Sequence, residues 1–85
     1  MKLYNETTKH IQVAVNRWGD KGNTGYCRVS PGKTETWSRS DTRGFIMSIE
    51  RAGETAKPYF VTCESEVKVY KDKITESAST IQPLA

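Results

Sequence analysis

The stretch HIQVAVNRW, residues 10–18, decides the fold class of this chain. Ile11, Val13 and Val15 occupy every second position, which is the period of a β-strand with one buried face. β-Branched residues, which favour strands, fill that buried phase. The glycine-rich segment 19–25 follows directly, and a helix could not continue through it. We therefore expect a strand over residues 10–18, followed by a loop.

The rest of the chain repeats this arrangement of short strands separated by turn signals. A short edge strand is expected at residues 3–4, and further strands are expected at residues 26–30, 34–39, 45–51, 59–64 and 67–71, with a last short strand or tail from residue 74 onward. No segment has the apolar spacing of a helix over three turns. Short strands at close intervals are typical of a sandwich or barrel. We predict a single all-β domain over residues 1–85, a small antiparallel β-sandwich or partly open barrel of six or seven short strands.

Alternation within each strand predicts which side chains form the core. The inward positions carry apolar side chains, whereas the positions between them are mostly polar, as in an antiparallel sheet with one face in water. The predicted core residues are Ile11, Val13, Val15, Cys27, Val29, Phe45, Met47, Ile49, Tyr59, Val61, Cys63, Val67 and Val69.

Length and composition limit the kind of site that this chain can build. Eighty-five residues form one domain, and an apolar share of 35% gives it a thin core. We therefore expect a shallow surface site rather than a large internal cavity. The net charge of +3 is concentrated in residues 1–43, which carry eight basic and four acidic side chains. An anionic partner would prefer that half, although an ordinary solvated surface explains the same charges.

Cys27 and Cys63 both fall in the buried phase of their strands, which favours a disulfide between them. Such a bond would stabilise the domain by about 3–4 kcal/mol, and small secreted domains often contain one. The alternative is a pair of reduced cysteines that pack as small apolar side chains. The disulfide makes a secreted protein the first expectation and a cytoplasmic one the alternative. No signal peptide and no transmembrane segment is visible in this chain.

No set of residues in the sequence points to catalysis. His10 is the only histidine, it lies outside the buried phase of its strand, and no nucleophile motif accompanies it. The glycines of segment 19–25 precede no helix whose N-terminus could bind a phosphate. One histidine and two widely spaced cysteines make a four-ligand metal site hard to assemble. We therefore expect neither an enzyme nor a metal or other cofactor.

Two aromatic residues flank the loop at 19–25. Trp18 precedes it and Tyr26 follows it, and the loop itself carries Asp20 and Asn23. An exposed aromatic ring can stack on the C–H face of a sugar, while carboxylate and amide groups bind its hydroxyls. The alternative is a cross-strand Trp–Tyr pair that stabilises the hairpin by about 0.2–1 kcal/mol.

A third aromatic residue of interest is Trp37, which shares its strand face with Glu35 and Arg39. Burying those two charges beside the indole would be costly, which favours an accessible face. The alternative is a core tryptophan in a strand short enough for both charges to reach solvent. With Arg28 added from the basic half, the candidate ligand-binding residues are Trp18, Asp20, Asn23, Tyr26, Arg28, Glu35, Trp37 and Arg39.

These residues favour a non-catalytic binding module with lectin-like recognition of a carbohydrate or a glycosylated cell surface, as in a defence protein. The first alternative is nucleic-acid binding through the basic N-terminal half, because bases stack on aromatic rings and phosphates pair with arginines. The second is a protein-interaction or inhibitor domain that uses a sheet edge or the loop at 19–25.

Overall fold

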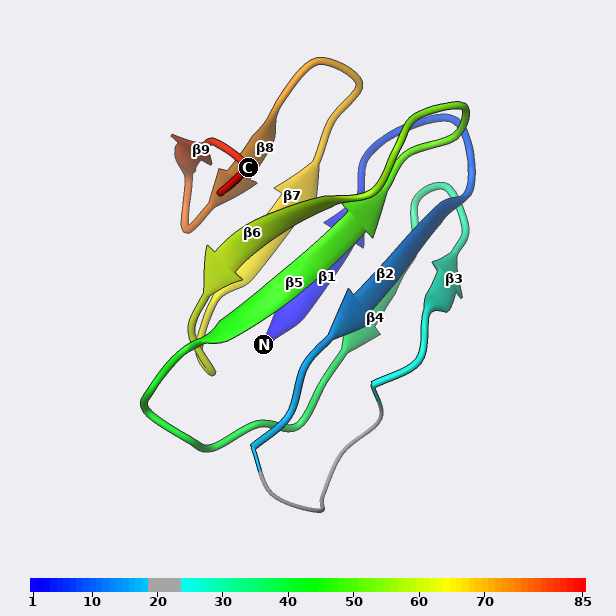
Figure 1. Ribbon diagram of the computed structural model, residues 1–85. Helices are drawn as coiled ribbons and strands as arrows, with labels where there is room; N and C mark the ends of the chain where they lie inside the picture. Colours follow the sequence, from blue (N-terminus) through cyan, green and yellow to red (C-terminus); the bar gives the residue numbers. More distant parts are fainter. Residues whose placement is uncertain (19–23) are drawn as a thin grey trace.

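The computed structural model of the chain describes residues 1–18 and 24–85, and these residues form strands but no helix. One sheet contains β1 (Lys2–Asn5), β4 (Thr34–Thr36), β7 (Glu66–Val69), β8 (Ile74–Glu76) and β9 (Ser79–Ile81). The other contains β2 (Ile11–Val15), β3 (Cys27–Val29), β5 (Phe45–Glu50) and β6 (Lys57–Val61). The all-β prediction is therefore confirmed, whereas the described residues form nine strands rather than the six or seven predicted (Figure 1). No helix long and apolar enough to cross a membrane occurs in the described residues.

The strand order is β4-β1-β7-β8-β9 in the five-stranded sheet and β3-β2-β5-β6 in the four-stranded sheet. Strand pairs are antiparallel except β1 and β7, which run parallel, with Leu3 opposite Val67. Parallel neighbours need a crossover connection. Here the chain between β1 and β7 provides it by building the whole four-stranded sheet. The segment at 3–4, expected as an edge strand, is consequently a central strand between β4 and β7.

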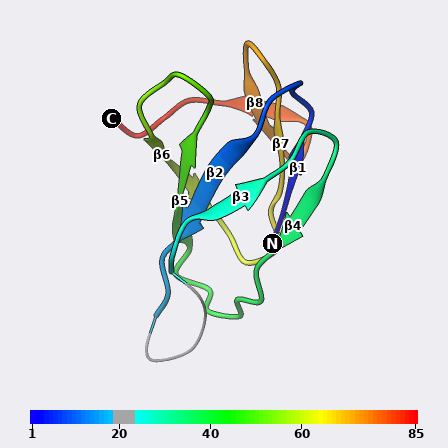
Figure 2. The same ribbon diagram turned by 90° about the vertical axis from the view of Figure 1, so that its right-hand side faces the viewer.

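The core side chains come from both sheets and lie between them. Figure 2 shows the two sheets in a view turned by 90°. Eleven of the thirteen predicted core residues are buried, while Cys27 and Cys63 are half-buried and pack against the cluster. Strand phase therefore predicted the contributions of β2, β5, β6 and β7 correctly. The additional apolar core residues are Met1, Leu3, Trp37 and Ile74, all from the five-stranded sheet or its flanking segments.

The predicted disulfide is wrong, because Cys27 and Cys63 are not bonded to each other. Cys27 belongs to β3 and Cys63 follows β6, and these are the two edge strands of the same sheet. Three strand spacings separate them, which amounts to about 14 Å. A disulfide requires Cα atoms within about 7 Å. The two residues share a phase but lie at opposite edges, and a sequence pattern carries no information on that separation.

A polar residue, Asn5, connects the two sheets. Its side chain is fully buried, and Nδ2 donates to the carbonyl oxygens of Val29 in β3 and Lys9 in the following loop, both at 2.9 Å. Its Oδ1 accepts hydrogen bonds from the backbone N and the hydroxyl of Thr7. These bonds satisfy the amide completely, so its burial costs little.

Candidate ligand-binding face

The outward side chains of the four-stranded sheet form rows across its strands. In the first row Gln12 lies opposite both Arg28 and Glu50. In the second row Ser48 lies between Ala14 and Pro58. The third row pairs Ile46 with Phe60, which lie directly opposite each other on β5 and β6. Polar side chains therefore dominate one end of this face and apolar side chains the other.

Four of the five exposed large apolar side chains among the described residues lie on this face or at its rim. Their exposed fractions are 41% for Trp18, 54% for Tyr26, 39% for Ile46 and 52% for Phe60. We call these four residues the apolar face. Trp18 lies at the rim, where the chain has left β2. Exposed apolar groups that gather on one side of a small domain commonly mark an interaction surface.

Tyr26 extends across the sheet from its edge. It precedes Cys27, which lies opposite Val13, and its hydroxyl is 2.8 Å from the hydroxyl of Ser48 on β5. The side chain therefore passes over β2 close to Ala14, the neighbour of Ser48 in the register. A small residue at position 14 leaves space for the ring. This bond holds the Tyr26 ring against the sheet with one side open to solvent.

Gly44 directly precedes β5 and contacts both Trp18 and Phe60. The indole N–H of Trp18 donates to the carbonyl oxygen of Gly44 at 2.8 Å. The Phe60 ring lies so close to Gly44 that a Cβ there would overlap ring carbons Cζ and Cε1. Gly44 also has a φ of +90°, which residues with a Cβ rarely adopt. The position of two aromatic side chains thus depends on a glycine.

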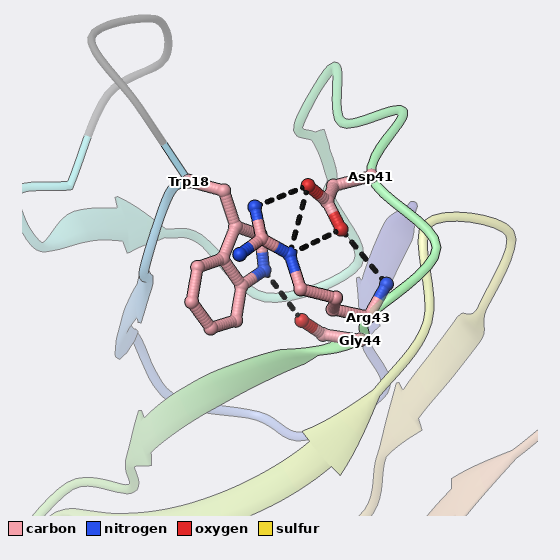
Figure 3. A network of polar contacts seen from close by, with 4 residues as sticks. All are labelled: Trp18, Asp41, Arg43 and Gly44. Atoms are coloured by element: carbon pink, nitrogen blue, oxygen red, sulfur yellow. Dashed lines mark hydrogen bonds and ion pairs between the residues drawn. The ribbon is translucent and has the colours of Figure 1, made fainter.

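The exposed ring of Trp18 is covered on one side by Arg43 (Figure 3). The guanidinium carbon lies 4.0 Å from the ring centroid, a cation–π geometry. Asp41 holds this guanidinium through hydrogen bonds from Nε and Nη2 and also accepts the backbone N–H of Arg43 at 2.8 Å. Hydrogen bonds from the Arg43 side chain and backbone lower the pKa of Asp41 to about 2. The Asp41 carboxylate likewise raises the pKa of Arg43.

Arg39, a predicted ligand-binding residue, is used internally. Its Nε donates to the carbonyl oxygen of Asn16 at 3.1 Å, and Nη2 donates to that of Val15 at 3.3 Å. Both carbonyls lie at the end of β2, where the ladder stops. The guanidinium therefore satisfies backbone acceptors and connects the segment after β4 to the four-stranded sheet.

Trp37 is buried in the core and does not belong to the accessible surface. The β4 strand ends at Thr36, one residue before it, and this early end resolves the conflict with its charged neighbours. Glu35 is half-buried opposite Leu3 in the five-stranded sheet. Arg39 lies beyond the end of β4, and its side chain reaches the carbonyl oxygen of Asn16 after β2. The alternative of a core tryptophan in a short strand is the one that the structure supports.

The structure thus brings together only part of the predicted set. Trp18, Tyr26 and Arg28 belong to the four-stranded sheet or its rim, whereas Glu35 and Trp37 belong to the other sheet region. Asp20 and Asn23 lie outside the described residues. Two members of the apolar face, Ile46 and Phe60, were not among the predicted ligand-binding residues. Their strand phase was the available signal, because each alternates with predicted core residues and must point outward.

Titratable residues form no metal cluster in the part of the chain that the structure describes. Within residues 1–18 and 24–85, no three His, Cys, Asp or Glu side chains are grouped so that they could hold a metal ion. His10 is exposed and directly precedes β2.

Comparisons with protein families, with characterised proteins and with solved structures find no match to this chain. The geometry of the apolar face therefore carries the functional argument.

Proposed function

We propose that this protein is a non-catalytic, lectin-like binding module in which two sheets, packed as a β-sandwich, present the apolar face to a carbohydrate. The observation that carries this proposal is the gathering of Trp18, Tyr26, Ile46 and Phe60 on one side of the four-stranded sheet. A shallow face of this kind suits a ligand that lies flat against it.

The chemistry of the face supports a sugar ligand. Aromatic rings offer flat apolar surfaces, and Tyr and Trp combine such a surface with a polar group. Beside them, Gln12, Ser48 and Glu50 lie in adjacent outward positions of β2 and β5. Their amide, hydroxyl and carboxylate groups can donate to and accept from sugar hydroxyls. A few polar groups beside apolar surface fix the orientation of a small ligand.

The nucleic-acid alternative is less favoured, because two of the arginines near the face already have partners. Arg39 donates to backbone carbonyls, and Arg43 is held by Asp41 over the Trp18 ring. A nucleic acid would have to replace these contacts or rely on the remaining cations. Binding dominated by phosphate contacts needs several cations that are available together.

A protein partner is the second candidate, and the Ile46–Phe60 pair favours it. Aliphatic side chains contribute little to sugar stacking, yet Ile46 is central to the apolar face. Centres of protein interfaces are apolar and rich in aromatic residues. A partner protein would bury Ile46 and Phe60 together, whereas a sugar would contact mainly the rings.

The location that we propose for the protein rests on a separate observation. No disulfide joins Cys27 to Cys63, whereas small secreted domains commonly rely on disulfides. We therefore favour the cytoplasmic alternative over secretion. A cytoplasmic protein with a defence role would then have to bind its glycan ligand inside the cell or after the protein itself is released from the cell.

A glycan array followed by titration of its best ligand tests the proposal. We expect Tyr26→Ala and Phe60→Ala each to weaken binding about tenfold or more, as buried aromatic contacts do. Lys68→Ala, an exposed substitution on the outer face of the other sheet, is the matched control and should leave affinity unchanged. No glycan hit, together with capture of a protein partner that Ile46→Ser abolishes, would replace the lectin proposal by the second candidate. Binding that requires Arg28 and falls steeply with salt would indicate nucleic acid.

A further inference from the structure

Arg51 lies just beyond the end of β5 that is remote from Trp18. Its side chain contains a buried nitrogen without a hydrogen-bond partner. Arg51 directly follows this strand, and its carbonyl oxygen accepts the N–H of Glu54 in the turn toward β6. Its side chain is 19% exposed, and its Nε is buried without a hydrogen-bond partner. Among the described residues, no other buried side-chain nitrogen or oxygen is left so. A buried donor without an acceptor is destabilising.

The nearest carboxylate does not satisfy this guanidinium. Arg51 Nη1 lies 3.8 Å from Oε1 of Glu54, which is longer than a hydrogen bond, and Glu54 is largely exposed. An ion pair at that distance with one exposed partner contributes little to stability. Most of the hydrogen-bonding capacity of Arg51 is therefore available to a ligand.

Arg51 lines a cavity of about 230 Å³ at the open edges of the two sheets. Lys57 and Tyr59 come from β6, and Asp72 and Lys73 come from the turn before β8. The segment after β9 completes the wall, because the N–H of Leu84 donates to the carbonyl oxygen of Pro58 at 2.8 Å. The lining includes three cationic residues, Arg51, Lys57 and Lys73, but only one carboxylate, that of Asp72. The cavity therefore favours an anion.

Tyr59 adds a neutral donor to this wall. Burial raises the pKa of its phenol, the charge of Arg51 lowers it, and the charge of Glu54 raises it. The hydroxyl is therefore protonated at neutral pH and can donate to an anionic oxygen.

A second cavity lies on another side of Arg51 and is a poorer anion site. It measures about 360 Å³ and is lined by Lys9, Arg51 and Lys71 together with the carboxylates of Glu6 and Glu54. Two carboxylates against three cations leave a weaker positive charge than in the smaller cavity. By its lining residues the smaller cavity is the more positive of the two, while Glu54, paired with Arg51, acts on both.

We propose that the 230 Å³ cavity binds a small oxyanion, namely a phosphate group, through the guanidinium of Arg51, with Lys57 and Lys73 beside it. Charge-assisted hydrogen bonds from arginine to phosphate are among the strongest that proteins make. The cavity is smaller than the 300–1,000 Å³ common for drug-sized ligands, about the size for a phosphate on a small molecule. This site is separate from the apolar face and does not depend on its function.

Titration of the ¹⁵N-labelled protein with inorganic phosphate at constant ionic strength tests the site. We expect the Arg51 Nε–Hε resonance to shift and saturate, while that of Arg28 on the four-stranded sheet stays in place. Arg51→Gln should weaken binding about tenfold or more, because a charged donor is lost, and Arg28→Gln should leave it unchanged. Lys57→Gln and Lys73→Gln should each weaken it to a smaller extent.

Glycerol 3-phosphate in the same titration distinguishes the two sources of a phosphate group. Tighter binding than inorganic phosphate would assign the site to a phosphate monoester, and equal binding would assign it to the free ion. The wild-type resonance keeps the test valid even where Arg51→Gln does not fold. An Arg51 resonance that does not move with either compound, or that moves no more than that of Arg28, would overturn the proposal.

Discussion

The two sheets of this molecule share one core but differ in their outer faces. On the five-stranded sheet, Tyr4 donates to Glu66 Oε1 at 3.2 Å, and the ammonium group of Lys68 lies 5.9 Å from the centroid of the Tyr4 ring. The hydrogen bond to Glu66 raises the pKa of Tyr4. The four-stranded sheet instead exposes Ile46 and Phe60 side by side. One outer face pairs its polar groups with each other, whereas the other leaves apolar surface uncovered.

This difference separates ordinary solvation from a candidate function. An antiparallel sheet with one face in water is expected to be polar on that face, and the five-stranded sheet follows the rule. A thin core has no apolar residues to spare, so exposing four large ones on one side goes against stability. A binding role explains why the four-stranded sheet departs from the rule.

The largest effect is expected from Gly44→Ala, which breaks the arrangement of the apolar face. The new Cβ would force the Phe60 ring away and would strain a backbone with a φ of +90°. We expect a loss of about 2–3 kcal/mol in the free energy of unfolding. Gly32→Ala is the control, because Gly32 has a φ of +74° but nothing within 4 Å of an added Cβ. Chemical denaturation of both variants measures the difference, and equal losses would show that Phe60 contributes nothing there.

The double variant Ile46→Thr and Phe60→Thr should lose less stability than Gly44→Ala. It should, however, expose clearly less apolar surface. Both side chains are exposed, so the free energy of unfolding should change by about 1 kcal/mol or less. Binding of an apolar fluorescent dye should fall several-fold, because the apolar face loses its centre. Lys68→Thr on the other sheet should alter neither quantity. If the dye bound the double variant as well as the wild type, the apolar face would not be the accessible apolar surface.

Acidification should affect the rim of the apolar face before it affects the fold. The pKa of Asp41 lies at about 2, below its ordinary value of 3.8, because Arg43 donates to it. A lowered folded-state pKa means that the stabilisation is present above pH 4 and is lost as the pH falls toward 2. Trp18 fluorescence should therefore change in this range as Arg43 loses its anchor. Asp41→Asn should abolish the change, and an identical titration in that variant would contradict the assignment.

The smallest effect concerns the cysteines, where we expect none. Reducing agent should leave the thermal midpoint of the wild type unchanged, since Cys27 and Cys63 lie at opposite edges of the four-stranded sheet. A thiol assay on the denatured protein should detect two thiols. A drop in the midpoint on reduction would show that the two edges approach each other more closely than in this structure.

Strand phase made much of the core predictable. Ile11, Val13 and Val15 alternate with polar residues, and a side-chain period of two can bury only one of those sets. By the same alternation Met47 points inward and Ile46 points outward. These features depend on neighbours along the chain alone, which is why a single sequence could reveal them.

The candidate site was only partly predictable. Trp18 and Tyr26 were found because they flank a loop, but Trp37 was included although it is buried. Its orientation depends on where β4 ends and on Arg39 reaching the carbonyl oxygens of β2. Arg51 gave no signal at all in the sequence. Its surroundings come from β6, from the turn before β8 and from the segment after β9.

Local pattern therefore decided the class of the fold and the inward set of each strand, because alternation and turn residues act within a few positions. Tertiary structure alone decided which strands became neighbours. It placed Cys27 and Cys63 at opposite edges, it made β1 a central strand beside β7, and it brought Phe60 over Gly44. Contacts between residues far apart in the chain depend on how two sheets pack and pair, and the period of a single strand contains no record of that packing.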